Sequence, residues 1–164
     1  LSAKQFNQPD LVDQLSAIIH ESGANPANLK IEVTESCLLN DPDEARQRMA
    51  RIKEKNPGIL IAIDDFGAGY SSLSYLSELA VDILKIDQSF VTNLYTSRHN
   101  PKIVNTILAL ALSLHLGVIA EGVETEEQLH YLATKECKLF QGFYFARPMP
   151  PEELEKHISA LRQT

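Results

Sequence analysis

The chain has 164 residues, 44% of them hydrophobic, which is enough for one globular domain with a sizeable core. Its net charge of -7 argues against binding a nucleic-acid polymer through a basic surface, and its two cysteines, Cys37 and Cys137, lack zinc-site spacing and indicate free thiols in a reducing compartment. No segment has the pattern of a signal peptide or of a membrane span, so we expect a cytoplasmic domain without membrane contact, or the cytoplasmic part of a larger membrane-bound protein.

The first part of the chain alternates helix and strand patterns. Residues 1–2 resemble the end of a strand whose beginning is missing, and a helix is expected over 9–23. Alternating and β-branched residues predict a strand over 29–34, where two acids, Glu32 and Glu35, gather at the C-terminal end.

The next helix has a clear start signal. Asp41 can cap it, Pro42 suits its first position, and Glu44 completes a capping-box pattern. We expect its basic residues to form a solvated face and not a binding patch: Arg46, Arg48, Arg51 and Lys53.

The most informative segment is an apolar strand over 59–63 that leads into two acids and a glycine-rich turn. Because it is apolar throughout, it is expected to be buried on both faces, in a parallel sheet covered by helices. Asp64 and Asp65 follow it, and Gly67 and Gly69 permit positive φ. Ligand chemistry in such folds is placed at the C-terminal ends of strands, so these acids are candidate metal ligands; the alternative is that one of them only caps a helix.

Strand and helix patterns keep alternating to the end of the chain. The expected elements are a helix over 72–79, a strand over 81–86, a helix over 101–116, a strand over 117–121, a helix from Thr125, a strand over 138–141 and a helix from Pro150. This order predicts βα units that build a parallel sheet or barrel with right-handed crossovers.

Each of these apolar strands ends in a polar residue. If the strands are parallel, five side chains converge on one rim, with Asp65 beside them: Glu32, Asp64, Lys85, Glu121 and Gln141. Burying several acids together without a cation would cost several kcal/mol per charge, and Mg²⁺ or Mn²⁺ prefers all-oxygen sites of this kind.

Two reaction classes fit such a rim. One is proton abstraction next to a carboxylate, with Lys85 as the base and a metal that holds an enolate. The other is metal-assisted hydrolysis of a phosphate ester. The tandem acids Asp64 and Asp65 favour the second, because one carboxylate can bridge two ions while its neighbour holds one of them. Spacing alone does not decide between them.

Five motifs occur in order, at residues 32–35, 64–72, 84–87, 120–124 and 141–148. Together they resemble the EAL domain family of bacterial cyclic di-GMP phosphodiesterases, and the resemblance covers almost the whole chain. It implies a (β/α)8 TIM-type barrel that hydrolyses cyclic di-GMP to linear pGpG with two divalent cations, Mg²⁺ or Mn²⁺.

The resemblance also implies roles for individual residues. Glu32, Asp64 and Asp65 correspond to metal ligands, with Asp64 as the bridge. Glu121 corresponds to the acid at the second metal and is a candidate general base, and Lys85 to the residue that orients the attacking water. Further residues correspond to substrate-binding, supporting and loop-anchoring positions: Gln141 and Pro148 for substrate, Glu124 for support, and Glu35 with Gly67 and Gly69 for the loop after Asp65.

The resemblance is to only part of a full barrel, which takes roughly 250 residues. Residues 1–164 are expected to form a single EAL-type phosphodiesterase domain, its C-terminal two-thirds, lacking roughly the first two βα units and the Glu-Ala-Leu segment with its metal ligand. Two alternatives therefore stay open: an inactive cyclic di-GMP receptor, and a regulatory or dimerisation module. The family implies a homodimer through the loop and helix after Asp65, and fusion to or regulation by sensory or GGDEF-type domains.

Overall fold

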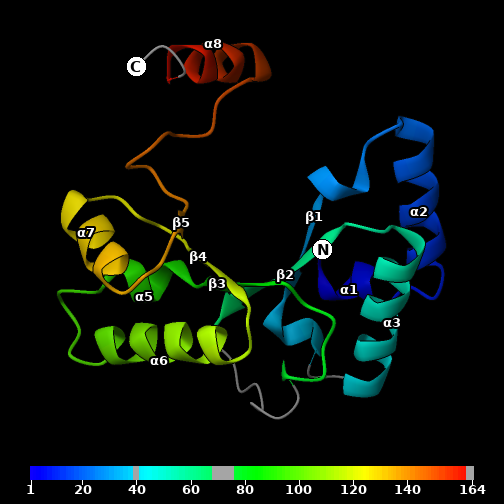
Figure 1. Cartoon of the computed structure of the whole chain (residues 1–164), viewed down its shortest axis with the longest axis horizontal. Coiled ribbons are helices and arrows are strands. Elements are labelled where there is room, and N and C mark those ends of the chain that lie inside the picture. The colour runs from blue at the N-terminus through cyan, green and yellow to red at the C-terminus, as the bar shows by residue number, and fades with distance from the viewer. Residues whose placement is uncertain (39–40, 68–75, 162–164) are drawn as a thin grey trace.

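The computed structural model describes residues 1–38, 41–67 and 76–161, and in them one parallel sheet organises the chain (Figure 1). Its five strands follow the order β1-β2-β3-β4-β5, so strands that neighbour one another in sequence also pair in space. They are β1 (Lys30–Thr34), β2 (Leu60–Phe66), β3 (Ile83–Ile86), β4 (Gly117–Ala120) and β5 (Leu139–Phe140). The parallel α/β class predicted from the alternating pattern is confirmed.

Helices connect the strands in two groups. Figure 1 shows α1, α2 and α3 beside β1 and β2, with α5, α6 and α7 at the other end of the sheet and α8 set apart. The helices are α1 (Ala3–Phe6), α2 (Leu11–Ser22), α3 (Pro42–Lys55), α5 (Gln88–Thr92), α6 (Asn100–Ser113), α7 (Glu126–Thr134) and α8 (Pro151–Leu161), with 3-10 turns η1 (Pro26–Asn28) and η2 (Glu35–Leu38). None of the helices in these described ranges is long and apolar enough to cross a membrane.

The predicted start signals are confirmed at α7 and in part at α3. Thr125 and Gln128 form a reciprocal capping box at the start of α7. Asp41 accepts a hydrogen bond from the backbone N–H of Glu44 at the start of α3, but the side chain of Glu44 pairs with Arg48 and does not complete the predicted capping box.

Two short helices were not foreseen. Residues 1–2 lead into α1 and not along a strand, and α5 follows directly after the Asp87 cap. The first half of the helix expected over 72–79, residues 72–75, lies outside the described residues.

The two faces of the sheet carry different apolar clusters. The main core lies between the helices and one face, and it includes the fully buried Val33, Ile61 and Leu84. A second, small cluster on the opposite face consists of Ala62, Ile83 and Ile119. Each of these three comes two residues before a polar member of the predicted rim, so the candidate site lies on the second face, at the C-terminal ends of the strands.

One expectation about α3 is wrong. Arg48 is not part of a solvated face: only 2% of it is exposed, and it lies against the ring of Phe6. Its guanidinium donates to the backbone carbonyls of Phe6 and Gln8 and pairs with Glu44. An arginine with these three partners can be buried, and charge spacing along a helix cannot reveal partners from another segment.

Candidate functional site

Lys85 lies at the centre of the site, on the middle strand of the sheet. Its side chain is 3% exposed, and its Nζ is 2.9 Å from Oε2 of Glu32, 2.8 Å from Oδ1 of Asp64 and 2.7 Å from Oε1 of Glu121. Strand parity placed these four residues on one rim, and the structure brings them together there.

The tandem acids serve the same site because β2 is irregular at this point. Successive residues of a regular strand point to opposite faces, but the pairing of β2 with β3 shifts register between Ile63 and Phe66, and Asp65 has a φ of 54°. As a result, one carboxylate oxygen from each of Asp64, Asp65 and Glu121 lies within 4.8 Å of the others.

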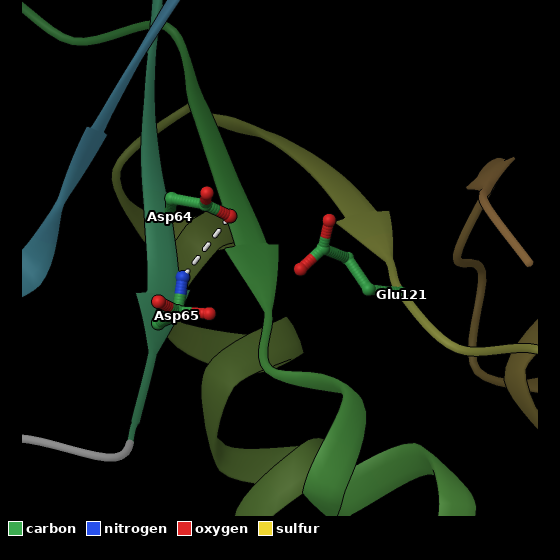
Figure 2. Close-up of side chains that lie close together, drawn as sticks. All are labelled: Asp64, Asp65 and Glu121. Carbon is green, nitrogen blue, oxygen red and sulfur yellow. Dashed lines mark hydrogen bonds between the residues drawn. The ribbon is translucent and has the colours of Figure 1, made fainter. Parts of the chain in front are cut away.

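These acids fit a hard divalent cation. Figure 2 shows the carboxylates of Asp64 and Glu121 turned toward each other, with Asp65 directly below Asp64. The donors are all oxygen atoms, and their side chains come from β2 and from the residue after β4, the two strands that pair with β3 on either side. Glu32 brings a further carboxylate to the same ammonium group. Mg²⁺ and Mn²⁺ are bound in proteins by donors of this kind.

The local electrostatics follow from this crowding. Burial lowers the pKa of Lys85, but hydrogen bonds with Asp64, Glu121 and Glu32 outweigh it and hold the pKa well above its usual value. Burial raises the pKa of Glu121, against the opposing effect of Lys85, and the nearby Asp64 and Glu32 raise it further. The pKa of Asp65 is raised by burial and by the charges of Asp64 and Asp87.

Glu35 holds the start of the loop that follows the tandem acids. Only 3% of it is exposed, and its Oε2 accepts a hydrogen bond of 3.1 Å from the backbone N–H of Gly67. Gly67 has a φ of 101°, and a Cβ there would lie 2.9 Å from Cδ1 of Ile107 and 3.0 Å from the ring of Phe90. Glycine is therefore required at Gly67. The other glycine of this motif, Gly69, lies outside the described residues.

A hollow of about 430 Å³ opens beside the acids, and three further predicted residues line it, namely Gln141, Pro148 and Glu124. Asp65 and Glu121 contribute to the same wall. A larger hollow, of about 650 Å³, lies between α6 and the connection from α7 to β5, and it contains none of the predicted site residues. Chemistry and not volume therefore identifies the candidate site.

The segment that carries Gln141 is hydrogen-bonded to the turn after β4. The carbonyl of Gln141 accepts a hydrogen bond of 3.1 Å from the N–H of Val123, and the N–H of Tyr144 donates to the carbonyl of Val123 at 3.0 Å. Gly142 makes this approach possible, because a Cβ on it would lie 2.1 Å from the Val123 carbonyl oxygen. The small residue thus positions the whole 141–148 segment.

Several residues near the site were not predicted. Asp87 interacts with Asp65, and Gln88, Phe143 and Arg147 line the hollow, with the Arg147 guanidinium 4.5 Å from the centre of the Phe143 ring. Asp87 and Gln88 follow the C-terminal end of β3, and Asp65 lies near the C-terminal end of β2, so the strand-end rule could have found them. The motif at 141–148 contains Phe143 and Arg147, but nothing in its spacing shows that they pair.

The comparisons with known proteins agree with this geometry. The EAL domain family model matches residues 1–148. The chain is 40% identical over 160 residues to the cyclic di-GMP phosphodiesterase NbdA of Pseudomonas aeruginosa, an alignment that covers 98% of this chain and 20% of that protein.

Solved structures show the same similarity. The PaMucR phosphodiesterase in complex with c-di-GMP superposes with a TM-score of 0.90 at 42% identity, covering 94% of this chain and 62% of that one. A manganese/cy-diGMP complex of Klebsiella pneumoniae BlrP1 has a TM-score of 0.77 at 36% identity, covering 88% and 36% of the two chains.

The sequence alignment with NbdA covers nearly all of this chain but only about a fifth of NbdA. The family model spans the sheet and all the residues around Lys85. The five strands match part of the TIM-type barrel of the solved neighbours, as the fold prediction required. The chain belongs to the EAL domain family.

Proposed function

We propose that this domain is a metal-dependent phosphodiesterase that hydrolyses cyclic di-GMP to linear pGpG. The observation that carries the proposal is the convergence of Glu32, Asp64 and Glu121 on Lys85, from separate strands, with Asp65 beside them. Relatives and structural neighbours that share this fold are named as cyclic di-GMP phosphodiesterases or were solved with that ligand.

Two divalent cations, Mg²⁺ or Mn²⁺, would be held by Glu32, Asp64, Asp65 and Glu121. When bound, they would neutralise phosphate charge and make water more acidic, so that an acidic protein can process an anionic dinucleotide. In the hydrolysis, the oxygen of water bonds to phosphorus, the ester P–O bond breaks, and the departing ribose oxygen takes up a proton.

The residues of this chain would divide the remaining tasks. Glu121 is the candidate to accept the proton of the attacking water, since burial raises its pKa and leaves it a better base than an ordinary glutamate. Lys85 would orient that water and stabilise the charge that develops. Gln141 and Pro148 would contact the substrate from the wall of the hollow, with Glu124 supporting the site.

Glu35 and Gly67 would keep the loop after Asp65 in place. We propose that the protein forms a homodimer through that loop and the helix expected after it, most of which lie outside the described residues. We also propose that residues 1–164 are one domain of a cytoplasmic enzyme, or of the cytoplasmic part of a membrane-bound one, under the control of sensory or GGDEF-type domains.

The decisive test is to incubate the intact protein with cyclic di-GMP and Mg²⁺ or Mn²⁺ and to measure pGpG by chromatography. We expect product from the wild type and none from Asp64→Asn. A suitable control is Asp43→Asn, because the side chain of Asp43 is 85% exposed on α3 and belongs neither to the contacts of Lys85 nor to the lining of the hollow, so this variant should keep full activity. Binding without turnover would instead make the protein a receptor. Neither binding nor turnover would leave a regulatory or dimerisation module.

A further inference from the structure

We propose that Lys85 is the built-in counter-ion of the carboxylate cluster and that divalent cations compete with it for the same oxygen atoms. This inference rests on the proposed function only in assuming that the cluster binds such cations. It gives Lys85 a role before any substrate arrives: it makes the crowded acids tolerable and sets how tightly metal ions are held.

The ammonium group of Lys85 is surrounded by carboxylates. Its ammonium group has three hydrogens, and three carboxylates lie between 2.7 and 2.9 Å from its nitrogen, so every donor has one acidic partner. The side chain is 3% exposed, whereas the carboxylates of Asp64 and Glu121 are 24% and 14% exposed. The positive charge is therefore the most buried member of the cluster.

The second step is electrostatic. Asp64 and Glu121 are the two acids that contact Lys85 and also belong to the group of three that could hold a metal ion. A cation bound there draws on oxygen atoms that already neutralise the ammonium group, and it lies close to that positive charge. Lys85 thus stabilises the fold without a metal and weakens the affinity for one.

Lys85→Met tests both effects, because methionine keeps much of the apolar stem and removes the charge. In EDTA, the melting temperature should fall by roughly 10 °C, the expected cost of leaving partly buried carboxylates without a partner. Mn²⁺ affinity, measured by calorimetry, should become tighter by on the order of tenfold, since the repulsion between the two cations is lost. The melting temperature gained on adding Mn²⁺ should be larger than in the wild type.

Lys53→Met is the matched control. Lys53 pairs with Asp82 at 2.5 Å on the α3 side of the sheet, with side chains 31% and 27% exposed, and shares no acid with the cluster. It should leave Mn²⁺ affinity unchanged. If Lys85→Met does not fold in EDTA, the double variant Lys85→Met/Glu121→Gln, which also removes one negative charge, should regain much of the lost stability.

The outcomes separate this inference from the proposed function. If the wild type binds Mn²⁺ and Lys85→Met melts like the wild type in EDTA, or binds Mn²⁺ more weakly, the counter-ion role is refuted while the phosphodiesterase proposal stands. Failure of the double variant to regain stability refutes it as well. If the wild type hydrolyses nothing but Lys85→Met shows both effects, the inference survives and the proposed reaction fails.

Discussion

Replacing Gly142 with alanine should disrupt the wall of the hollow beside the acids. The added Cβ would lie 2.1 Å from the carbonyl oxygen, 2.4 Å from the nitrogen and 2.7 Å from the carbonyl carbon of Val123, all of them backbone atoms that cannot rotate away. Ordinary contacts begin near 3.4 Å, so the segment must move by more than an ångström. That movement would break the two hydrogen bonds between Val123 and the 141–144 turn.

The cost can be estimated from these contacts. Two lost backbone hydrogen bonds at about 1 kcal/mol each, with some overpacking strain, give roughly 2–4 kcal/mol. For a chain of this length that lowers the melting temperature by roughly 5–15 °C. Because Gln141 moves with the turn, affinity for cyclic di-GMP should fall as well.

Thermal unfolding followed by circular dichroism measures the first effect, and calorimetric titration with cyclic di-GMP the second. Gly117→Ala is the control, since a Cβ on Gly117 would lie 3.4 Å from the Ile83 side chain and meet only ordinary contacts. The reasoning is refuted if Gly142→Ala melts within 2 °C of Gly117→Ala, an interval of roughly 1 kcal/mol or less.

Two further predictions concern charge. Because the folded-state pKa of Glu121 is raised above its ordinary value of 4.5, its effect on stability is fully favourable only below that value and is lost as pH rises through the folded pKa. In EDTA, the free energy of unfolding of the wild type should therefore fall relative to that of Glu121→Gln as pH rises from 4.5. Urea unfolding at several pH values measures this difference, and a difference that stays constant with pH would contradict the prediction. Arg48→Leu should cost roughly 2–4 kcal/mol, because it orphans the carbonyls of Phe6 and Gln8, whereas Arg46→Leu, at a side chain 44% exposed, should stay within about 0.5 kcal/mol. Equal costs for the two variants would show that the buried contacts of Arg48 contribute little.

The fold and the centre of the site were predictable because they depend on patterns within single segments. Apolar strands that end in acids, separated by capped helices, indicate a parallel sheet, and parity along each strand puts Asp64, Lys85 and Glu121 on the same face. These inferences need no knowledge of which segments touch.

The remaining features depend on contacts between segments. Parity alone sends Asp65 to the opposite face, and only the register shift in β2 returns its carboxylate to the site. Arg48 can be buried because the backbone carbonyls of Phe6 and Gln8 accept hydrogen bonds from its guanidinium. Glycine is needed at Gly142 because the backbone of Val123 lies too close for a Cβ. The sequence pattern around each residue does not reveal these partners.

The strand order has a consequence for the protein during its synthesis. Glu32 and Asp64 leave the ribosome before Lys85, and Glu121 follows it, and the strands that lead to these residues lie side by side in the sheet in the same order. The strands β1 and β2 are therefore synthesised with Glu32 and Asp64 before β3 brings Lys85, the lysine that pairs with both acids. Docking of β3 is for this reason the step at which the acids of β1 and β2 gain the positive partner that they share.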